Sequence, residues 1–224
     1  MTMRRSGINP FVTAVALLWA TCGAAQVPMP DGGTAPGFEV PQGGAPDAPV
    51  TDDAPATPAP GAPGADAAAL DALFAELADA DPEATPGIQN RIAEMWSRSG
   101  STAMDLLLRR GADAMAAGDT PLAIQHYSAL IDHAPEFAEG YNGRATAFYL
   151  AGQIGPSLAD IQTTLALNPR HFGAMSGLAV ILEELDRPED ALEVYDRILG
   201  IAPHAEGVAD AARRLTVTLD GLAL

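Results

Sequence analysis

Histidines, acidic clusters and serines are the side chains in this sequence that could do chemistry, so their spacing comes first. The four histidines are His126, His133, His171 and His204. No two of them lie four residues apart, so the pair of ligands that a helix offers to zinc is missing. Cys22 is the only cysteine, which rules out an intramolecular disulfide and a cysteine-based metal site. We therefore expect no bound metal.

Acids and serines form no catalytic pattern either. Residues 79–83, Asp-Ala-Asp-Pro-Glu, lack the glycine and the distal glutamate of a calcium-binding loop. The serines within residues 97–101 do not form GxSxG, and no predicted strand precedes them. Adjacent acids such as Glu183 and Glu184 are typical of a solvated helix face. The sequence predicts a protein that is not an enzyme and needs no cofactor.

The charge balance narrows the class of partner. The chain holds 29 Asp and Glu against 12 Arg, with no Lys, which gives a net charge of −17. Such a field repels phosphate backbones and anionic lipid surfaces, so nucleic acid is not expected as a partner. A basic protein partner and simple solubility are both consistent with the acidity.

Residues 1–25 have the layout of a secretory signal peptide. Two arginines at positions 4 and 5 precede the apolar run Phe11–Ala20, which is about ten residues long, whereas a membrane-spanning helix needs about 20. Small residues follow, so we expect cleavage after Ala25 and a periplasmic or secreted bacterial protein.

Two alternatives to this signal stay open. A lipid on Cys22 would tether the chain to a membrane, although Thr21 before it departs from the usual lipoprotein pattern. Twin-arginine export is the other, although the Ser-Gly-Ile-Asn that follows the arginines does not resemble the apolar continuation of that motif. A membrane is therefore expected as a partner only if Cys22 carries a lipid.

Residues 26–65 predict a disordered spacer. They contain ten prolines, seven glycines, five acids and no basic residue. Too few large apolar side chains are present to offset the entropy of ordering the chain. Repeats of Ala-Pro and Gly-Ala-Pro favour a semi-extended linker with polyproline character.

From residue 66 the pattern becomes helical. Leu70, Leu73, Phe74 and Leu77 recur three and four residues apart and so share one helical face. A second apolar stripe follows and ends at Trp96, which we expect to pack within this helix pair.

The next segment is periodic. Pro135, Pro169 and Pro203 are equally spaced along the chain. Small residues keep the same spacing in two further columns, Gly111, Ala145 and Ala179, and Ala123, Ser157 and Ala191.

A period of about 34 residues, with small residues at two fixed places and a terminal proline, resembles the tetratricopeptide repeat. The resemblance implies an all-α fold, a right-handed superhelical solenoid of antiparallel helix pairs. It divides the helical domain, 66–224, into a degenerate helix pair capping the N-terminal end (66–98), three repeats (104–137, 138–171 and 172–203) and a capping C-terminal helix (204–224).

The columns have physical reasons. The small residues let the two helices of a pair approach closely. Gly118 and Gly152 are expected at positive φ in the turn between the helices. Asp186 occupies the same column without that freedom, although Asp-Arg-Pro is still typical of a turn.

In this family the first helices of successive repeats line a concave groove, which holds a peptide or a partner's helix. Some relatives grip a C-terminal carboxylate there with Lys, Arg and Asn, but Arg109 and Asn142 alone do not make that clamp. Arg110 and Arg144 share another column, and we expect them to pair with acids. The groove columns map onto Asp105, Leu108, Arg109, Ala112, Met115, Asn142, Thr146, Tyr149, Ser176, Val180 and Glu183.

We therefore expect a non-catalytic scaffold or adaptor of the bacterial cell envelope that binds a protein or peptide through this groove. Two other classes stay open: a membrane-tethered lipoprotein component of an envelope assembly complex, and an accessory subunit of an enzyme. Repeat scaffolds serve many tasks, so this function rests on the family analogy.

Overall fold

A computed structural model describes residues 65–222, which form nine α-helices and contain no strand. Except for residue 65, the predicted signal peptide and spacer, with Cys22, lie outside this part of the chain. No helix within it is both long and apolar enough to span a bilayer. The helices are α2 (Ala65–Ala78), α3 (Thr85–Trp96), α4 (Thr102–Ala116), α5 (Thr120–His133), α6 (Ala138–Leu150), α7 (Ile154–Leu167), α8 (Phe172–Glu184), α9 (Pro188–Ile201) and α10 (Val208–Leu222).

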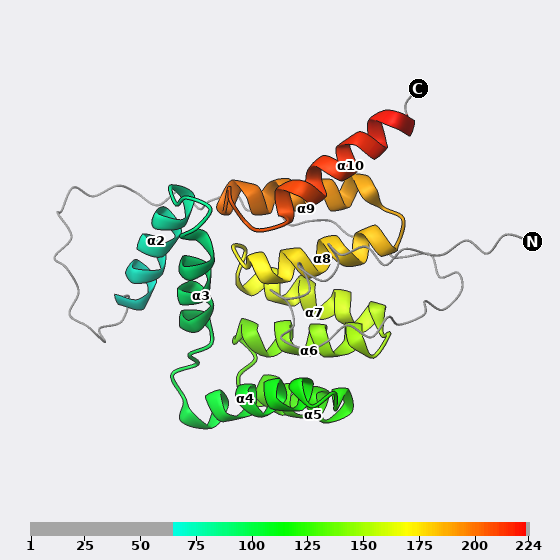
Figure 1. Cartoon of the computed structure of the whole chain (residues 1–224). Helices are drawn as coiled ribbons and strands as arrows, with labels where there is room; N and C mark the ends of the chain where they lie inside the picture. The colour runs from blue at the N-terminus through cyan, green and yellow to red at the C-terminus, as the bar shows by residue number, and fades with distance from the viewer. Residues whose placement is uncertain (1–64, 223–224) are drawn as a thin grey trace, which may run out of the picture.

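The helices are arranged as stacked pairs (Figure 1). α4 packs with α5, α6 with α7 and α8 with α9, and the pairs follow one another in chain order with α10 against α9. These pairs coincide with the three predicted repeats, and the prediction of an all-α helical solenoid is confirmed.

The turn inside each pair is left-handed at one residue. Gly118 has φ 75° and Gly152 has φ 73°, as their column predicted. Asp186 adopts the same conformation, with φ 56°, although it is not glycine. Aspartate tolerates this region better than most residues, because its short polar side chain can bond locally.

The first repeat is held together by one aromatic ring. Tyr127 of α5 is buried where α4, α5 and α6 meet. A Cβ added to Gly111 would lie 2.4 Å from the ring atom Cε1, and a Cβ added to Gly143 would lie 2.5 Å from the same atom. Burial, followed by the charges of Glu139 and Asp113, raises the pKa of Tyr127 to about 12. Glycine in both columns therefore makes room for this ring.

The same position is buried in the later repeats. Ile161 and Tyr195 occupy the column of Tyr127 one and two repeats later, and both side chains are almost fully covered. The small column beside them contains one polar residue, Ser157, whose hydroxyl donates to the carbonyl oxygen of Ala145 at 2.8 Å. That bond satisfies the hydroxyl inside the core.

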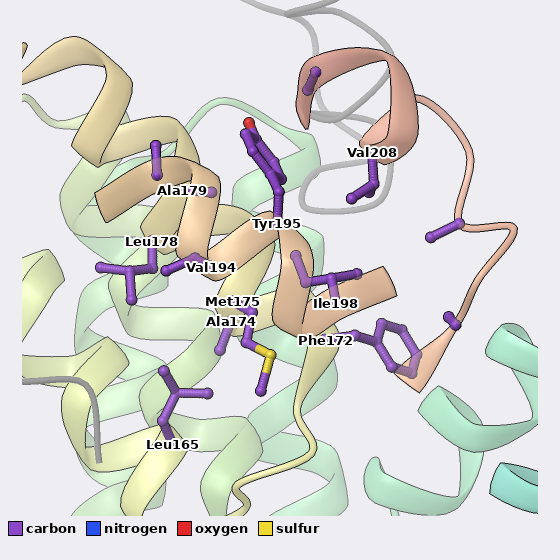
Figure 2. Packing of buried hydrophobic residues seen from close by; sticks show 14 of the residues in the cluster. Leu165, Phe172, Ala174, Met175, Leu178, Ala179, Val194, Tyr195, Ile198 and Val208 are labelled. Atoms are coloured by element: carbon purple, nitrogen blue, oxygen red, sulfur yellow. The ribbon is translucent and has the colours of Figure 1, made fainter. Parts of the chain in front are cut away.

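The main core lies around α8 and α9. Figure 2 shows side chains of these two helices, among them Leu178, Val194 and Tyr195, packed together, with Val208 reaching them from α10. The cluster continues into the N-terminal pair α2–α3. A smaller cluster lies between the first repeat and α6 and is formed by Ala114, Met115, Ala123, Tyr127 and Ala147.

The N-terminal pair forms as predicted but packs at a different place. The indole ring of Trp96 stacks on the His171 ring, with 4.5 Å between centroids, and its centroid lies 5.0 Å from that of Phe172. Both partners belong to the start of α8, whereas the helices that pack on α4 are α5 and α6. The expectation that the pair caps the N-terminal end of the repeats is therefore corrected.

α2 is attached to the same turn. Arg170 donates to a carboxylate oxygen of Asp71 at 2.6 Å, and its guanidinium carbon lies 4.1 Å from the centroid of the Phe74 ring. The pair thus covers the link between the second and third repeats. Figure 1 shows it at one edge of the stack, along the side where these links lie.

The composition of α4 explains why no other helix within residues 65–222 stacks on its outer face. The outer face of α4 exposes Leu106, Arg109, Arg110 and Asp113. One repeat later the same columns contain Gly140, Gly143, Arg144 and Ala147, and two repeats later they contain Ala174, Gly177, Leu178 and Ile181.

Small or apolar residues dominate these columns in the later repeats and pack against the preceding pair. Charged side chains in the first repeat would lose their hydration under a stacked helix. The first repeat therefore supplies its own polar end, as terminal units of solenoids do.

The role of Tyr127 predicts the effect of adding one methyl group. Gly143→Ala should lower the free energy of unfolding by about 1–3 kcal/mol, because the new Cβ overlaps the ring. Gly155→Ala is the matched control, since no atom lies within 4 Å of its added Cβ, and it should be neutral or stabilising by up to about 1 kcal/mol. Urea denaturation measures both, and equal effects in the two variants would refute the close contact.

Candidate functional site

The groove columns come from α4, α6 and α8, one set of residues from each repeat. Met115, Thr146 and Ser176 are buried, whereas Ala112 is exposed. The remaining members apart from Arg109 are half-buried: Asp105, Leu108, Asn142, Tyr149, Val180 and Glu183.

Arg109 belongs to a different face of α4. Gly143 stands in its column one repeat later and faces Tyr127 of the preceding pair. The column therefore points along the stack toward the preceding repeat. Within residues 65–222 no repeat stacks before α4, and the Arg109 side chain is exposed on the outer end of the first repeat. We remove it from the groove set.

The groove hydroxyls of α6 and α8 bond within their own helices. Thr146 donates to the carbonyl oxygen of Asn142 at 3.0 Å, and Ser176 donates to that of Phe172 at 2.9 Å. Such bonds to the preceding turn are common for Ser and Thr in helices. Neither hydroxyl proton is then free for a ligand.

Two acids at the end of α8 accept hydrogen bonds from tyrosines. Tyr149 donates to Glu184 at 2.5 Å, which connects α6 to α8, and Tyr195 donates to Glu183 at 2.6 Å. Arg214 of α10 also donates to Glu183, at 3.0 Å. Burial, and then the bonded carboxylate, raises the pKa of each tyrosine. Both hydroxyls therefore stay protonated at neutral pH and hold the acids in place.

Asp105 organises the start of α4. One carboxylate oxygen accepts from the hydroxyl of Ser99 at 2.6 Å and from its backbone N–H at 2.8 Å. These two bonds, helped by the nearby Arg109, hold the pKa of Asp105 below its usual value. Its contacts are those of a residue that positions the chain between α3 and α4.

A buried polar cluster connects the N-terminal pair to the groove. Nδ1 of His171 accepts from the backbone N–H of Ala174 at 3.0 Å, so it caps α8 and carries no proton. Its Nε2–H donates to Glu139 at 2.7 Å, and the amide nitrogen of Asn142 donates to the other oxygen of Glu139 at 3.5 Å. Trp96 covers the imidazole ring. The cluster therefore connects α3, α6 and α8.

Two atoms of this cluster have no hydrogen-bond partner among the described residues. They are the indole nitrogen of Trp96, a donor, and the amide oxygen of Asn142, an acceptor, and both are buried. Buried polar groups are nearly always paired, so each is a place where a partner group would gain energy.

The sequence-based reasoning missed Glu139 and Arg214. Glu139 stands one repeat after Asp105 in the same column, so applying the period to that groove residue finds it. Arg214 lies in α10, outside the repeats, and no periodic signal marks its contact with Glu183.

The expected pairing of the arginines holds for Arg144. Its guanidinium makes two bonds to Asp160, at 2.7 and 2.9 Å, and this partner holds the pKa of Arg144 above its usual value. Arg110 makes no ion pair within residues 65–222. The residue that stands where Asp160 would be, one repeat earlier, is His126. Within the same residues no three His, Cys, Asp or Glu side chains gather as metal ligands would.

The packing of Trp96 predicts local undocking. Trp96→Ala should remove about 3 kcal/mol of stability from the N-terminal pair, because the ring covers His171 and Phe172. Hydrogen exchange should then show lost protection in α2 and α3, with α6 and α7 unchanged, because repeat proteins can open in parts. Arg98→Ala is the control, since it removes only an exposed pair with Glu94. Protection lost evenly through all repeats would contradict this packing.

Comparisons with known proteins agree with this architecture. The tetratricopeptide-repeat family model matches residues 108–155 and 157–206. A TPR repeat-containing protein of Rhizobium etli is 33% identical over 153 residues, which cover 68% of this chain and 75% of that protein. The small glutamine-rich tetratricopeptide repeat-containing protein 2 of Saccharomyces cerevisiae is 30% identical over 114 residues, 51% of this chain and only 33% of the yeast protein.

A solved structure shares the fold. The first TPR domain of Spaghetti (RPAP3), determined with the HSP90 peptide SRMEEVD, superposes with a TM-score of 0.50 at 22% identity, over 52% of this chain and 95% of that domain. At this identity the likeness concerns the fold alone. The periodic columns, the stacked helix pairs and the Rhizobium relative together show that this chain belongs to the tetratricopeptide-repeat family.

Proposed function

We propose that this protein is a non-catalytic binding scaffold of the bacterial cell envelope, and that its groove holds a basic peptide or helix of a partner protein. Membership of a family of protein-interaction repeats supports the general role. The chemistry of the groove residues supports the kind of partner.

The observation that carries the proposal is the excess of acidic over basic side chains along α6 and α8. α6 and α8 carry the acids Glu139, Glu183 and Glu184, and the half-buried groove residues include Leu108, Tyr149 and Val180. Within the described chain, Arg214 is the one arginine bonded to any of these acids. A carboxylate ligand would meet repulsion here, whereas a Lys or Arg side chain would be attracted. The domain of RPAP3 binds an acidic peptide, so we expect a different ligand class for this chain.

Asn142 adds a directional contact. Its amide oxygen has no partner within residues 65–222, and its amide nitrogen points to Glu139. That oxygen is buried, so a backbone N–H of a bound peptide would reach it once the Asn142 side chain turns toward the groove. Tyr149 offers its ring as an anchor, since aromatic residues supply much of the binding energy at interfaces.

The envelope location rests on residues 1–25, whose layout is that of a signal peptide. Export would place the acidic spacer and the repeats in the periplasm. Cleavage after Ala25 would remove Cys22, whereas lipid attachment would retain it.

Affinity capture from the native envelope fraction, followed by mass spectrometry, tests both the groove as the binding site and export to the envelope. The double variant Asn142→Ala/Tyr149→Ala should lose most of the partner that the parent captures, because it removes the acceptor and the anchor. Arg109→Ala is the matched control on the outer end of α4, and it should capture as the parent does. Circular dichroism checks that all three chains are folded.

The mass spectra of the captured sample also give the N-terminus of the bait, which should begin at Gln26. A partner retained by the double variant would contradict the groove as the binding site. A bait found only in the cytosol would contradict export, and a lipid-modified Cys22 would replace the soluble form with a tethered one.

A further inference from the structure

A cleft of about 770 Å³ opens between the start of α4 and the turn from α5 to α6. This volume lies within the range of small-ligand sites, about 300–1,000 Å³. The cleft is distinct from the groove columns, none of which lines it. Its walls are Ser99, Ser101, Met104, His133, Ala134, Pro135, Glu136 and Phe137.

The equivalent turn one repeat later, between α7 and α8, already binds another part of the chain and shows which groups such a turn can hold. In residues 168–171, which connect α7 to α8, the ring of His171 stacks on the ring of Trp96, with 4.5 Å between centroids. The adjacent Arg170 pairs with Asp71 at 2.6 Å and covers the ring of Phe74. An aromatic side chain and an opposite charge from another helix pair are therefore held by two consecutive residues of the turn.

The two holding residues have counterparts in the cleft. Phe137 stands one repeat before His171 in the same column, and Glu136 stands one repeat before Arg170. Both line the cleft, and both precede α6 as their counterparts precede α8. Phe137 keeps a flat ring in the place of His171, whereas Glu136 puts a negative charge in the place of the positive Arg170.

We propose that this cleft docks a second partner segment that presents an aromatic side chain next to a Lys or Arg. The aromatic ring packs on Phe137, as Trp96 packs on His171, and the cation pairs with Glu136, as Asp71 pairs with Arg170. Asp132, exposed in the last turn of α5, adds attraction for a cation, and the net charge of −17 favours such a partner over an acidic one.

The proposal goes beyond the groove function, because the cleft shares no residue with the groove. The α2–α3 pair is the internal example of the docking mode. The external partner would lie one repeat earlier, beside the polar end of α4.

Two small probes test recognition of the aromatic ring and of the cation without the rest of a partner protein. Tryptamine carries an indole ring and an ammonium group, and indole-3-propionate carries the same ring and a carboxylate. Each is titrated into the full chain, with NMR shifts followed at the Met104 methyl group and at the backbone amides of Glu136 and Phe137. We expect saturable shifts at these three residues and a dissociation constant three- to fivefold lower for tryptamine.

Two charge reversals test the role of Glu136. Glu136→Arg should invert the preference, so that indole-3-propionate binds more tightly. Glu193→Arg makes the same change in net charge at an exposed position of α9, and it should leave the preference for tryptamine in place. Neither position is in the core, so both chains should fold.

The proposal is overturned if neither probe shifts the three cleft residues in the parent chain. It is also overturned if the ratio of the two dissociation constants is the same in Glu136→Arg and Glu193→Arg. Both results would leave the groove function untouched, since Asn142 and Tyr149 are unchanged in every chain used here.

Discussion

One large side chain in the second helix of each repeat, packed against small residues of the neighbouring helices, is the contact on which this structure depends. Tyr127 fills that place in the first repeat, Ile161 in the second and Tyr195 in the third. Where the contact is closest, any Cβ on Gly111 or Gly143 would overlap the Tyr127 ring. Because each repeat contacts mainly its neighbours, this one packing rule, applied once in every repeat, sets the spacing of the stack and the direction of its groove columns.

A second constraint acts at the end of the stack: burying charged side chains under another helix costs free energy of desolvation. Arg109, Arg110 and Asp113 stand in α4 where later repeats have mostly small or apolar residues, and no helix within residues 65–222 covers them. The apolar faces of α2 and α3 are buried instead in one cluster with the turn before α8 and with α9, and Trp96 lies over His171. One consequence is that the His171–Glu139–Asn142 cluster is covered from outside by α3, which fixes the edge of the groove next to α6.

The repeat period was readable in the sequence because its signals are local and recur: a proline, two small residues and a turn residue in every unit. The place of α2–α3 was not, because the contact between Trp96 and His171 joins residues more than two repeats apart and belongs to no repeat. The charged residues of α4 were the one sequence signal that the α2–α3 pair does not stack on that helix. Mapping the family's groove columns put both Leu108 and Arg109 in the groove, but one residue along a helix turns a side chain by about 100°. Glu139 was missed although it shares the column of Asp105, and Arg214 lies outside the period altogether.

The most direct test of this account is a set of nuclear Overhauser contacts from the Trp96 indole ring. Trp19→Phe leaves Trp96 as the one tryptophan of the chain and makes the assignment unambiguous. The account predicts cross-peaks from the indole protons to the rings of His171 and Phe172, whose centroids lie 4.5 and 5.0 Å away. Cross-peaks to Leu106 or Arg110 on the outer face of α4, with none to His171, would show that the pair stacks on the first repeat and would contradict it.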